Sequence, residues 1–201
     1  MARTKVFDPA AALDAAVRVF WEQGYEATST DDLVRAMGIG RQSMYDTFGD
    51  KKQLYLAALA RYTETGGAAL RQRLAAGPSP LGALEAFLGE IAGADAALRA
   101  RGCLSVNAVA EFGQAEPDVQ AHIERSQQVT EAIFAEQLLR ARQAGELAPG
   151  LDPAEAAHFI HTAIRGMRIS AKAGAGAAQL GATVDFVMAA LKARATPVAE
   201  V

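Results

Sequence analysis

Apolar residues recur along this chain at the three- and four-residue spacing of amphipathic helices, and no stretch alternates as a strand does beyond chance. Glycine and proline divide this pattern into blocks. The pattern predicts helices over about 9–23, 30–37, 41–48, 50–74, 81–99, 103–112, 117–144, 153–172 and 178–194. The predicted fold class is therefore all-α.

Two short predicted helices are joined by a tight turn over residues 38–40. Ser29 and Asp32 have the spacing of a capping box at the start of the first helix. In the second helix, Met44 and Phe48 are four residues apart and are expected to face inward. This order is typical of a helix-turn-helix, whose second helix enters the major groove of DNA.

The other positions of the second helix carry side chains that suit DNA. Arg41 can read guanine or bind phosphate, and Gln42 can form two hydrogen bonds with adenine. Hydroxyl groups suited to phosphate oxygens stand at Ser43, Tyr45 and Thr47. We therefore expect this face to point outward and to contact DNA.

The flanking residues decide between DNA binding and an ordinary packing motif, because many all-α proteins contain a short turn between helices. Lys51 is predicted in the first turn of the next helix, where exposed N–H groups favour a phosphate. A preceding helix opens at Pro9 and carries Phe20 and Trp21. Together these segments form a complete three-helix DNA-reading module.

Residues 9–59 resemble the TetR/AcrR family of transcriptional repressors. The residues that carry the resemblance are Ala15-Ala16-Val17, Phe20, Gly24-Tyr25, Thr28-Ser29, Leu33 to Gly38, Tyr45, Phe48 and Lys51 to Leu54. The resemblance implies backbone-phosphate contacts at Thr28, Tyr45 and Lys51, and a base-facing helix start over residues 41–43. Gly40 departs from the family, since many members carry a Ser or Thr cap there. We therefore expect the recognition helix to fray more easily in the free protein.

The net charge of -3 argues against a broad basic face for DNA. Residues 1–55 hold seven Lys and Arg against eight Asp and Glu. The DNA footprint is therefore expected to be local, with few phosphate contacts per subunit. Its predicted cations are Arg3, Lys5, Arg41, Lys51 and Lys52.

Composition favours a cytoplasmic protein with its own core. Apolar residues make up 51% of the chain, and the single cysteine, Cys103, points to a reducing compartment. The first residues do not have the pattern of a signal peptide. No apolar run approaches the roughly 20 residues that span a membrane. We expect a DNA-binding domain over 1–50 and a helical ligand-binding and dimerisation domain over 51–201.

The last two predicted helices have apolar stripes that include small residues. The stripes comprise Phe159, Ile160, Ala163, Ile164, Gly166 and Met167, then Leu180, Val184, Val187, Met188 and Leu191. They form either a hairpin within the chain or half of an intermolecular four-helix bundle. We favour the homodimer, because two recognition helices one DNA turn apart would bind a palindrome. The segment 166–180 also resembles the corresponding family region.

A pocket for an unidentified small-molecule effector is expected among the helices of residues 55–150. Its predicted ligand contacts are Tyr62, Phe87, Cys103, Asn107 and Phe134. Residues 102–107 resemble a GCL-x-x-N segment of a TetR subgroup, some of whose members respond to electrophiles or small organic compounds. Cys103 is either a reactive thiol or a small buried core residue.

Glu155, His158 and His161 recur every three residues, a spacing that builds metal sites when another helix adds ligands. No second ligand set is evident, so hydrogen-bonded or solvated histidines are favoured and no metal or cofactor is predicted. No phosphate-binding loop or nucleophile elbow appears, which argues against an enzyme. A purely structural or protein-binding helical module is the other alternative. The prediction is a ligand-responsive repressor of a palindromic operator, released by a small molecule.

Overall fold

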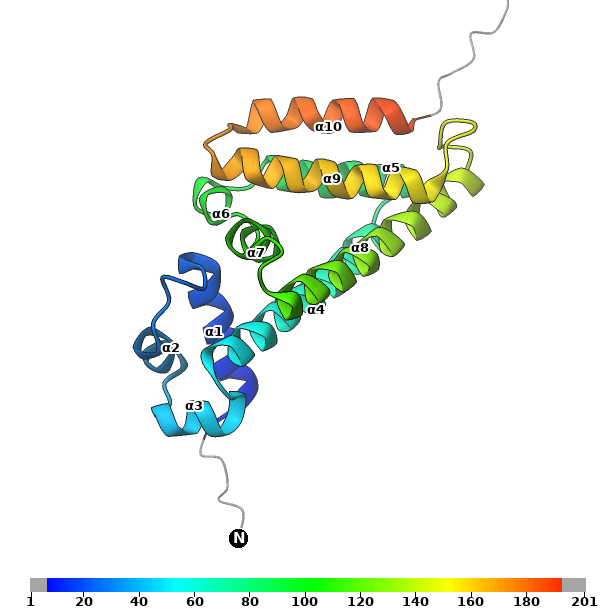
Figure 1. Ribbon diagram of the computed structural model, residues 1–201. Coiled ribbons are helices and arrows are strands. Elements are labelled where there is room, and N and C mark those ends of the chain that lie inside the picture. The colour runs from blue at the N-terminus through cyan, green and yellow to red at the C-terminus, as the bar shows by residue number, and fades with distance from the viewer. Residues whose placement is uncertain (1–6, 193–201) are drawn as a thin grey trace, which may run out of the picture. The chain divides into compact units, whose positions relative to one another are not determined.

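The computed structural model describes residues 7–192, and Figure 1 shows the order of its helices along the chain. The helices are α1 (Pro9–Gln23), α2 (Thr30–Met37), α3 (Arg41–Phe48), α4 (Lys51–Ala75), α5 (Pro80–Ala92), α6 (Ala96–Arg101), α7 (Leu104–Phe112), α8 (Pro117–Gln143), α9 (Pro153–Lys172) and α10 (Ala177–Leu191). An isolated β-bridge between Leu147 and Lys192 is the β-structure found in the described range. The predicted all-α class is confirmed.

Two compact units make up the chain. Unit 1 takes in the chain up to Gly66 together with Arg101–Ser126, and unit 2 takes in Gly67–Ala100 and the chain from Gln127 onward. The start of α4 and the inward residues of α7 (Leu104, Ala108 and Phe112) pack in the same core as α1, α2 and α3. This structural division differs from the predicted boundary at residue 50, which stays a prediction about function.

Local signals explain where the first helices of unit 1 begin and end. The Asp8 side chain accepts a hydrogen bond from the Ala10 N–H and caps α1, with Pro9 in its first turn. Ser29 and Asp32 form the predicted capping box of α2. Gly38 ends α2 in the left-handed conformation, with φ of 66°, which a residue with a Cβ adopts at a cost.

An aromatic cluster forms the centre of unit 1. Phe20 and Tyr55 are fully enclosed, and their rings meet edge to face with centroids 5.0 Å apart. Tyr25 lies 5.1 Å from Tyr55 and 5.2 Å from Phe112 by the same measure. The cluster therefore joins α1, the α1–α2 turn, α4 and α7 in one core.

Helix α7 also binds the α1–α2 turn through hydrogen bonds. The Glu111 carboxylate accepts from the backbone N–H of Tyr25 at 2.9 Å and of Glu26 at 2.7 Å. Gly24, with φ of 81°, allows this close approach, because a Cβ there would lie 3.2 Å from a Glu111 carboxylate oxygen. The Trp21 indole N–H donates to the Gly102 carbonyl at 3.1 Å. Segments far apart in the sequence thus hold the turn before α2.

Unit 2 is built on α5, α9 and α10, which pack on one another (Figure 1). The second half of α4 adds Leu70 and Leu74 to this core, and α8 adds Phe134. Gln137 is buried in it and donates to the carbonyls of Leu74 and Pro80. A buried amide with such partners avoids the cost of an unpaired polar group.

Two predicted helices of unit 2 end elsewhere than expected. The block predicted over 81–99 is divided, because α5 ends at Ala92 with Gly93 as its C-cap, and α6 begins after Asp95, which accepts from the Leu98 N–H. The last helix ends at Leu191 and not near 194. Lys192 leaves it to pair with Leu147, and residues 193 and 194 lie outside the described part.

Most residues of the predicted dimer stripes are buried within unit 2 itself. The buried members are Ile160, Ile164, Met167, Leu180, Val184, Val187, Met188 and Leu191. The hairpin alternative therefore describes what these residues do within one chain. Large apolar side chains remain exposed on the same two helices at Phe159 (47%), Ile169 (58%) and Phe186 (80%). No helix in the described residues is both long and apolar enough to cross a membrane.

The capping box of α2 generates a stability prediction. Replacing Ser29 with Ala removes the side chain that accepts from the Asp32 N–H and donates to its carboxylate. We expect the free energy of unfolding to fall by about 1 kcal/mol, the usual cost of losing an N-cap. Denaturant unfolding followed by circular dichroism measures it. Ser170→Ala, at an exposed position late in α9, is the control. Equal values for the two variants would show that the cap contributes nothing.

Candidate nucleic-acid interface

Helix α3 presents the predicted outward face. Met44 is fully buried beneath it, and Ile39 and Phe48 pack against the same core. Arg41 and Gln42 are exposed, as is Tyr45 at 41%. Ser43 and Thr47 are half-buried at the edges of this face. The predicted division of α3 into an inward and an outward side is confirmed, and Gly40 gives the helix no side-chain cap.

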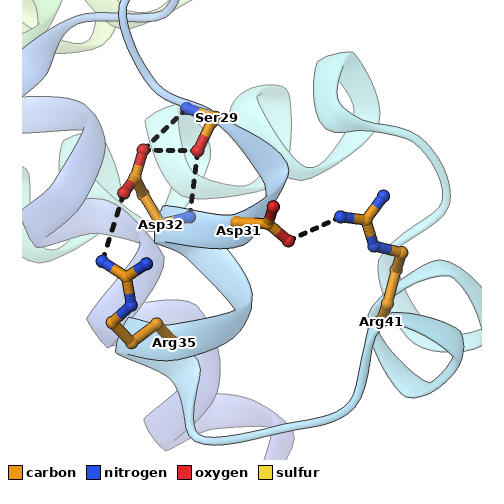
Figure 2. Close-up of polar contacts among 5 residues, drawn as sticks. All are labelled: Ser29, Asp31, Asp32, Arg35 and Arg41. Atoms are coloured by element: carbon orange, nitrogen blue, oxygen red, sulfur yellow. Dashed lines mark hydrogen bonds and ion pairs between the residues drawn. The ribbon is translucent and has the colours of Figure 1, made fainter.

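Arg41, the first residue of α3, is held by a carboxylate of α2. Its Nη2 lies 2.5 Å from Oδ1 of Asp31, across the turn that joins the two helices (Figure 2). The neighbouring acid, Asp32, faces Ser29 and also lies 3.6 Å from Arg35. Hydrogen bonds from the Ser29 hydroxyl and amide lower the pKa of Asp32, which therefore stays charged.

Gln42 has a carboxylate neighbour of its own. Its side-chain amide donates to Oδ1 of Asp46, four residues later in α3, at 2.7 Å. One N–H and the carbonyl oxygen of the amide remain for a base, since a glutamine amide has two N–H donors. Two acids, Asp31 and Asp46, thus contact the two predicted base readers.

Lys51 begins α4 and lies over an aromatic ring. Its Nζ is 4.3 Å from the centroid of the Tyr25 ring, which is a cation–π contact. Burial raises the pKa of Tyr25, so this ring stays neutral. Asp50 caps α4 by accepting from the Gln53 N–H, as predicted, and the Gln53 side chain accepts from the Asp50 N–H in return. Lys51 therefore stands at a capped helix start, where N–H groups attract anions.

The rest of the predicted basic footprint is more constrained. Lys52 contacts Glu116 at 2.5 Å and Asp118 at 3.4 Å, so its charge is shared with two acids of unit 1. Its hydrogen bond with Glu116 raises its pKa. Arg3 and Lys5 lie outside the described residues.

Thr28 does not fit the phosphate contact that the family resemblance implies. Its side chain is only 1% exposed, and its hydroxyl donates to the Gly24 carbonyl at 2.5 Å. A phosphate accepts hydrogen bonds and needs a free donor. The structure therefore assigns this hydroxyl to closing the turn before α2, and the expected side-chain contact is corrected.

The five predicted ligand contacts fall into two groups, one in each unit. In unit 1, the Tyr62 hydroxyl lies 3.5 Å from Sγ of Cys103, and the Asn107 side chain donates to the Arg101 carbonyl. In unit 2, the rings of Phe87 and Phe134 are 6.2 Å apart, and Phe134 is buried in the core. Their role in ligand binding stays a prediction.

Cys103 is half-buried at the N-cap of α7. It is not enclosed as a small core residue would be, and its sulfur has a polar neighbour in Tyr62. The Tyr62 ring in turn contacts the Trp21 ring, with centroids 5.0 Å apart. The thiol therefore lies beside aromatic residues that belong to the unit of the helix-turn-helix.

The two histidines of α9 share a carboxylate that the sequence pattern did not indicate. Oε1 of Glu131, on α8, lies 2.9 Å from Nδ1 of His158 and 3.3 Å from Nδ1 of His161. Burial raises the pKa of Glu131, but hydrogen bonds from both histidines and from Gln127 outweigh it and lower that pKa overall. Burial lowers the pKa of His161. Among the described residues, no three His, Cys, Asp or Glu side chains are grouped to hold a metal ion.

Sequence reasoning did not predict the contacts that Asp31, Asp46 and Glu111 make with the helix-turn-helix and the turn before it. The spacing of four between Gln42 and Asp46 is a local signal that reveals their contact. The contact of Asp31 joins two helices and that of Glu111 joins α7 to the α1–α2 turn, and no local spacing predicts either.

Comparison with known proteins agrees with this geometry. Residues 12–58 match a family model described as bacterial regulatory proteins of the tetR family, and residues 80–187 match one described as a tetracyclin repressor-like C-terminal domain. YezE of Bacillus subtilis, an HTH-type transcriptional regulator, is 35% identical over 195 residues, which cover 95% of this chain and 100% of YezE.

Two further relatives have more specific names. The HTH-type transcriptional repressor ComR of Escherichia coli is 35% identical over 181 residues, which cover 89% of this chain and 86% of ComR. The structure of a cysteine mutant of the TetR family regulator CifR, in complex with double-strand operator DNA, is 30% identical with a TM-score of 0.79. The match covers 94% of this chain and 99% of the CifR chain. This chain belongs to the TetR family of transcriptional regulators.

Proposed function

We propose that this chain is a ligand-responsive repressor that binds a palindromic operator as a homodimer and is released by a small molecule. Like its relatives, it is a transcriptional regulator and not an enzyme. The observation that carries the proposal is the outward face of α3, where Arg41, Gln42 and Tyr45 are exposed above the buried Met44. CifR, which has a similar fold, is complexed with operator DNA, and ComR is named a repressor.

The proposed DNA contacts divide into readers and phosphate contacts. Arg41, Gln42 and Ser43 would meet base edges, since they form the first turn of the recognition helix. Tyr45, Thr47 and Lys51 would contact phosphates and fix the register. Few such contacts are available in each subunit, so binding is expected to need two subunits.

The proposed dimer uses the apolar side chains that unit 2 leaves exposed on α9 and α10. Phe186 is 80% exposed, and Phe159 and Ile169 are about half exposed, although the other large apolar side chains of the same helices are buried in the core. An exposed apolar surface of this kind suits a self-complementary two-fold interface.

The proposed effector response requires a ligand that prefers the form with low DNA affinity. A preference of about 2 kcal/mol changes DNA affinity about 30-fold. The predicted ligand contacts offer aromatic rings at Tyr62, Phe87 and Phe134, a thiol at Cys103 and an amide at Asn107. The rings of Phe87 and Phe134 belong to unit 2 and the other three residues to unit 1, and either group suits a small, largely apolar organic compound. A cytoplasmic location accompanies this proposal, since the target is DNA.

The proposal is tested by incubating the purified chain with a random-sequence duplex pool and sequencing the retained DNA. We expect enrichment of a palindrome whose half-sites are about one helical turn apart, because a two-fold dimer presents two recognition helices. Retention that falls uniformly with salt, without any enriched sequence, would contradict the proposal.

Tyr45→Ala and Lys51→Ala test the phosphate contacts. Each is expected to weaken operator and non-operator duplexes by similar factors. Lys51→Ala, which removes a charge, should also reduce the salt slope by about 1, whereas Tyr45→Ala removes no charge and should leave the slope unchanged. Fluorescence anisotropy across a range of salt concentrations measures both quantities. Arg71→Ala, at an exposed arginine of α4 in unit 2, is the charge-matched control and should leave both unchanged. A change of preferred sequence in either variant would contradict the assignment to phosphate.

Gln42→Ala tests base reading. We expect the preference at one base pair of each half-site to be lost, at a cost of about 1–3 kcal/mol against the original operator. Repeating the enrichment with the variant measures this. Gln120→Ala is a matched control, because Gln120 donates to Glu124 four residues later as Gln42 donates to Asp46. An unaltered preferred site in Gln42→Ala would show that Gln42 reads no base.

Phe186→Lys tests the dimer. A charged side chain at this exposed position should leave the fold intact but place two charges in the interface. The dimer is expected to weaken by about 2 kcal/mol, or roughly 30-fold in Kd, and operator affinity should fall with it. Analytical ultracentrifugation measures the change. Leu98→Lys, at a 41% exposed residue of α6, is the control. Equal association of the two variants would exclude Phe186 from the interface.

A further inference from the structure

The ion pair between Asp31 and Arg41 lies on the surface that would face DNA. Its partners are 71% and 56% exposed, so water screens the attraction between them. An exposed pair of this kind adds little to the stability of a fold. It nevertheless joins two helices across the turn of the helix-turn-helix (Figure 2). A contribution to stability therefore does not explain why this ion pair lies between α2 and α3.

Asp31 is also not needed to cap α2. The capping box is completed by Ser29 and Asp32, which exchange hydrogen bonds between side chains and backbone N–H groups. Asp31 instead directs its carboxylate away from this box and toward Arg41 (Figure 2). Two adjacent aspartates thus have different partners, one within its own helix and one on the recognition helix.

We propose that Asp31 is a specificity-determining residue, which restricts Arg41 to base contact and prevents it from acting as a general phosphate contact. The carboxylate positions the guanidinium at the start of α3 and opposes the approach of a second anion. This inference rests on the proposed function, because it assumes that Arg41 meets DNA.

The chemistry of the two DNA groups explains the discrimination. A guanidinium has five N–H donors, and the contact of Nη2 with Asp31 leaves donors for the neutral N7 and O6 acceptors of guanine. A phosphate carries a negative charge, which the Asp31 carboxylate repels at close range. Asp31 therefore disfavours the sequence-independent contact and preserves the sequence-dependent one.

The second predicted reader has a similar neighbour. Gln42 donates to Asp46 on the same outward face of α3, which places another carboxylate where phosphates would otherwise approach. If this surface contacted only phosphates, removing the carboxylates of Asp31 and Asp46 would increase its affinity for DNA. Their presence beside the readers agrees with a surface that gives up general affinity for selectivity.

Asp31→Asn tests the inference, because it removes the charge and keeps the size of the side chain. We expect the affinity for a scrambled duplex to rise about threefold to tenfold, with a salt slope steeper by about 1 per subunit. The affinity for the enriched operator should change less, so the ratio of operator affinity to scrambled-duplex affinity should fall. Fluorescence anisotropy on both duplexes over a range of salt concentrations gives these values.

A second readout locates the effect on Arg41. The duplex enrichment is repeated with Arg41→Ala, which identifies the base pair that Arg41 reads. Asp31→Asn is expected to lose preference at that same base pair and to keep the others. Asp31→Glu, which retains the charge, is expected to keep the low affinity for scrambled DNA. A merely structural role for Asp31 would shift no single base position.

The control is Asp14→Asn, which also removes one negative charge and one exposed Asp–Arg pair from unit 1. Asp14 contacts Arg61 at 2.8 Å, and these residues lie on α1 and α4, outside the helix-turn-helix. Equal affinity ratios and salt slopes for Asp14→Asn and Asp31→Asn would overturn the inference alone. Absence of any enriched sequence with the unmodified chain would overturn the proposed function and the inference with it.

Discussion

The direction of the recognition helix depends on the burial of Met44 in a core that α3 shares with α1, α4 and α7. Phe20 and Tyr55 are fully buried at the centre of this core. Protein interiors are close-packed, so a helix anchored in one has little room to shift alone. Arg41 and Gln42 are long and flexible, and their ordering on binding costs conformational entropy. Because the backbone beneath them is already fixed, that cost is confined to the side chains.

Under the proposed function, the acids beside Arg41 and Gln42 would allow a chain of net charge -3 to bind DNA selectively. Among the described cations of the predicted footprint, Arg41 contacts Asp31 and Lys52 contacts Glu116, and each contact weakens the attraction of that cation for phosphates at a distance. Short hydrogen bonds to base edges do not depend on net charge in this way. Low general affinity helps a regulator, because a genome offers about 10⁶–10⁹ competing sites.

Much of the fold was predictable because its determining interactions are local. The capping box of α2 and the bounds of α1, α3 and α9 follow from residues within four positions of one another. The break at Gly93 was missed, because alanines on both sides keep the helical pattern unbroken. The contacts of Asp31 with Arg41 and of Glu111 with Tyr25 depend on how separate helices pack. No spacing in the sequence contains that information.

Helix α7 and its N-cap carry two of the predicted ligand contacts, Cys103 and Asn107, and belong to unit 1, which also contains α3. Cys103 lies at the start of α7 beside Tyr62, and Glu111 near its end accepts two backbone N–H groups from the turn before α2. Rigid secondary elements are one means by which energetic coupling passes between sites. A change at Cys103 that displaces α7 must either carry that turn with it or break the hydrogen bonds of Glu111. Both outcomes would alter the turn that precedes α2, and all of these residues belong to unit 1.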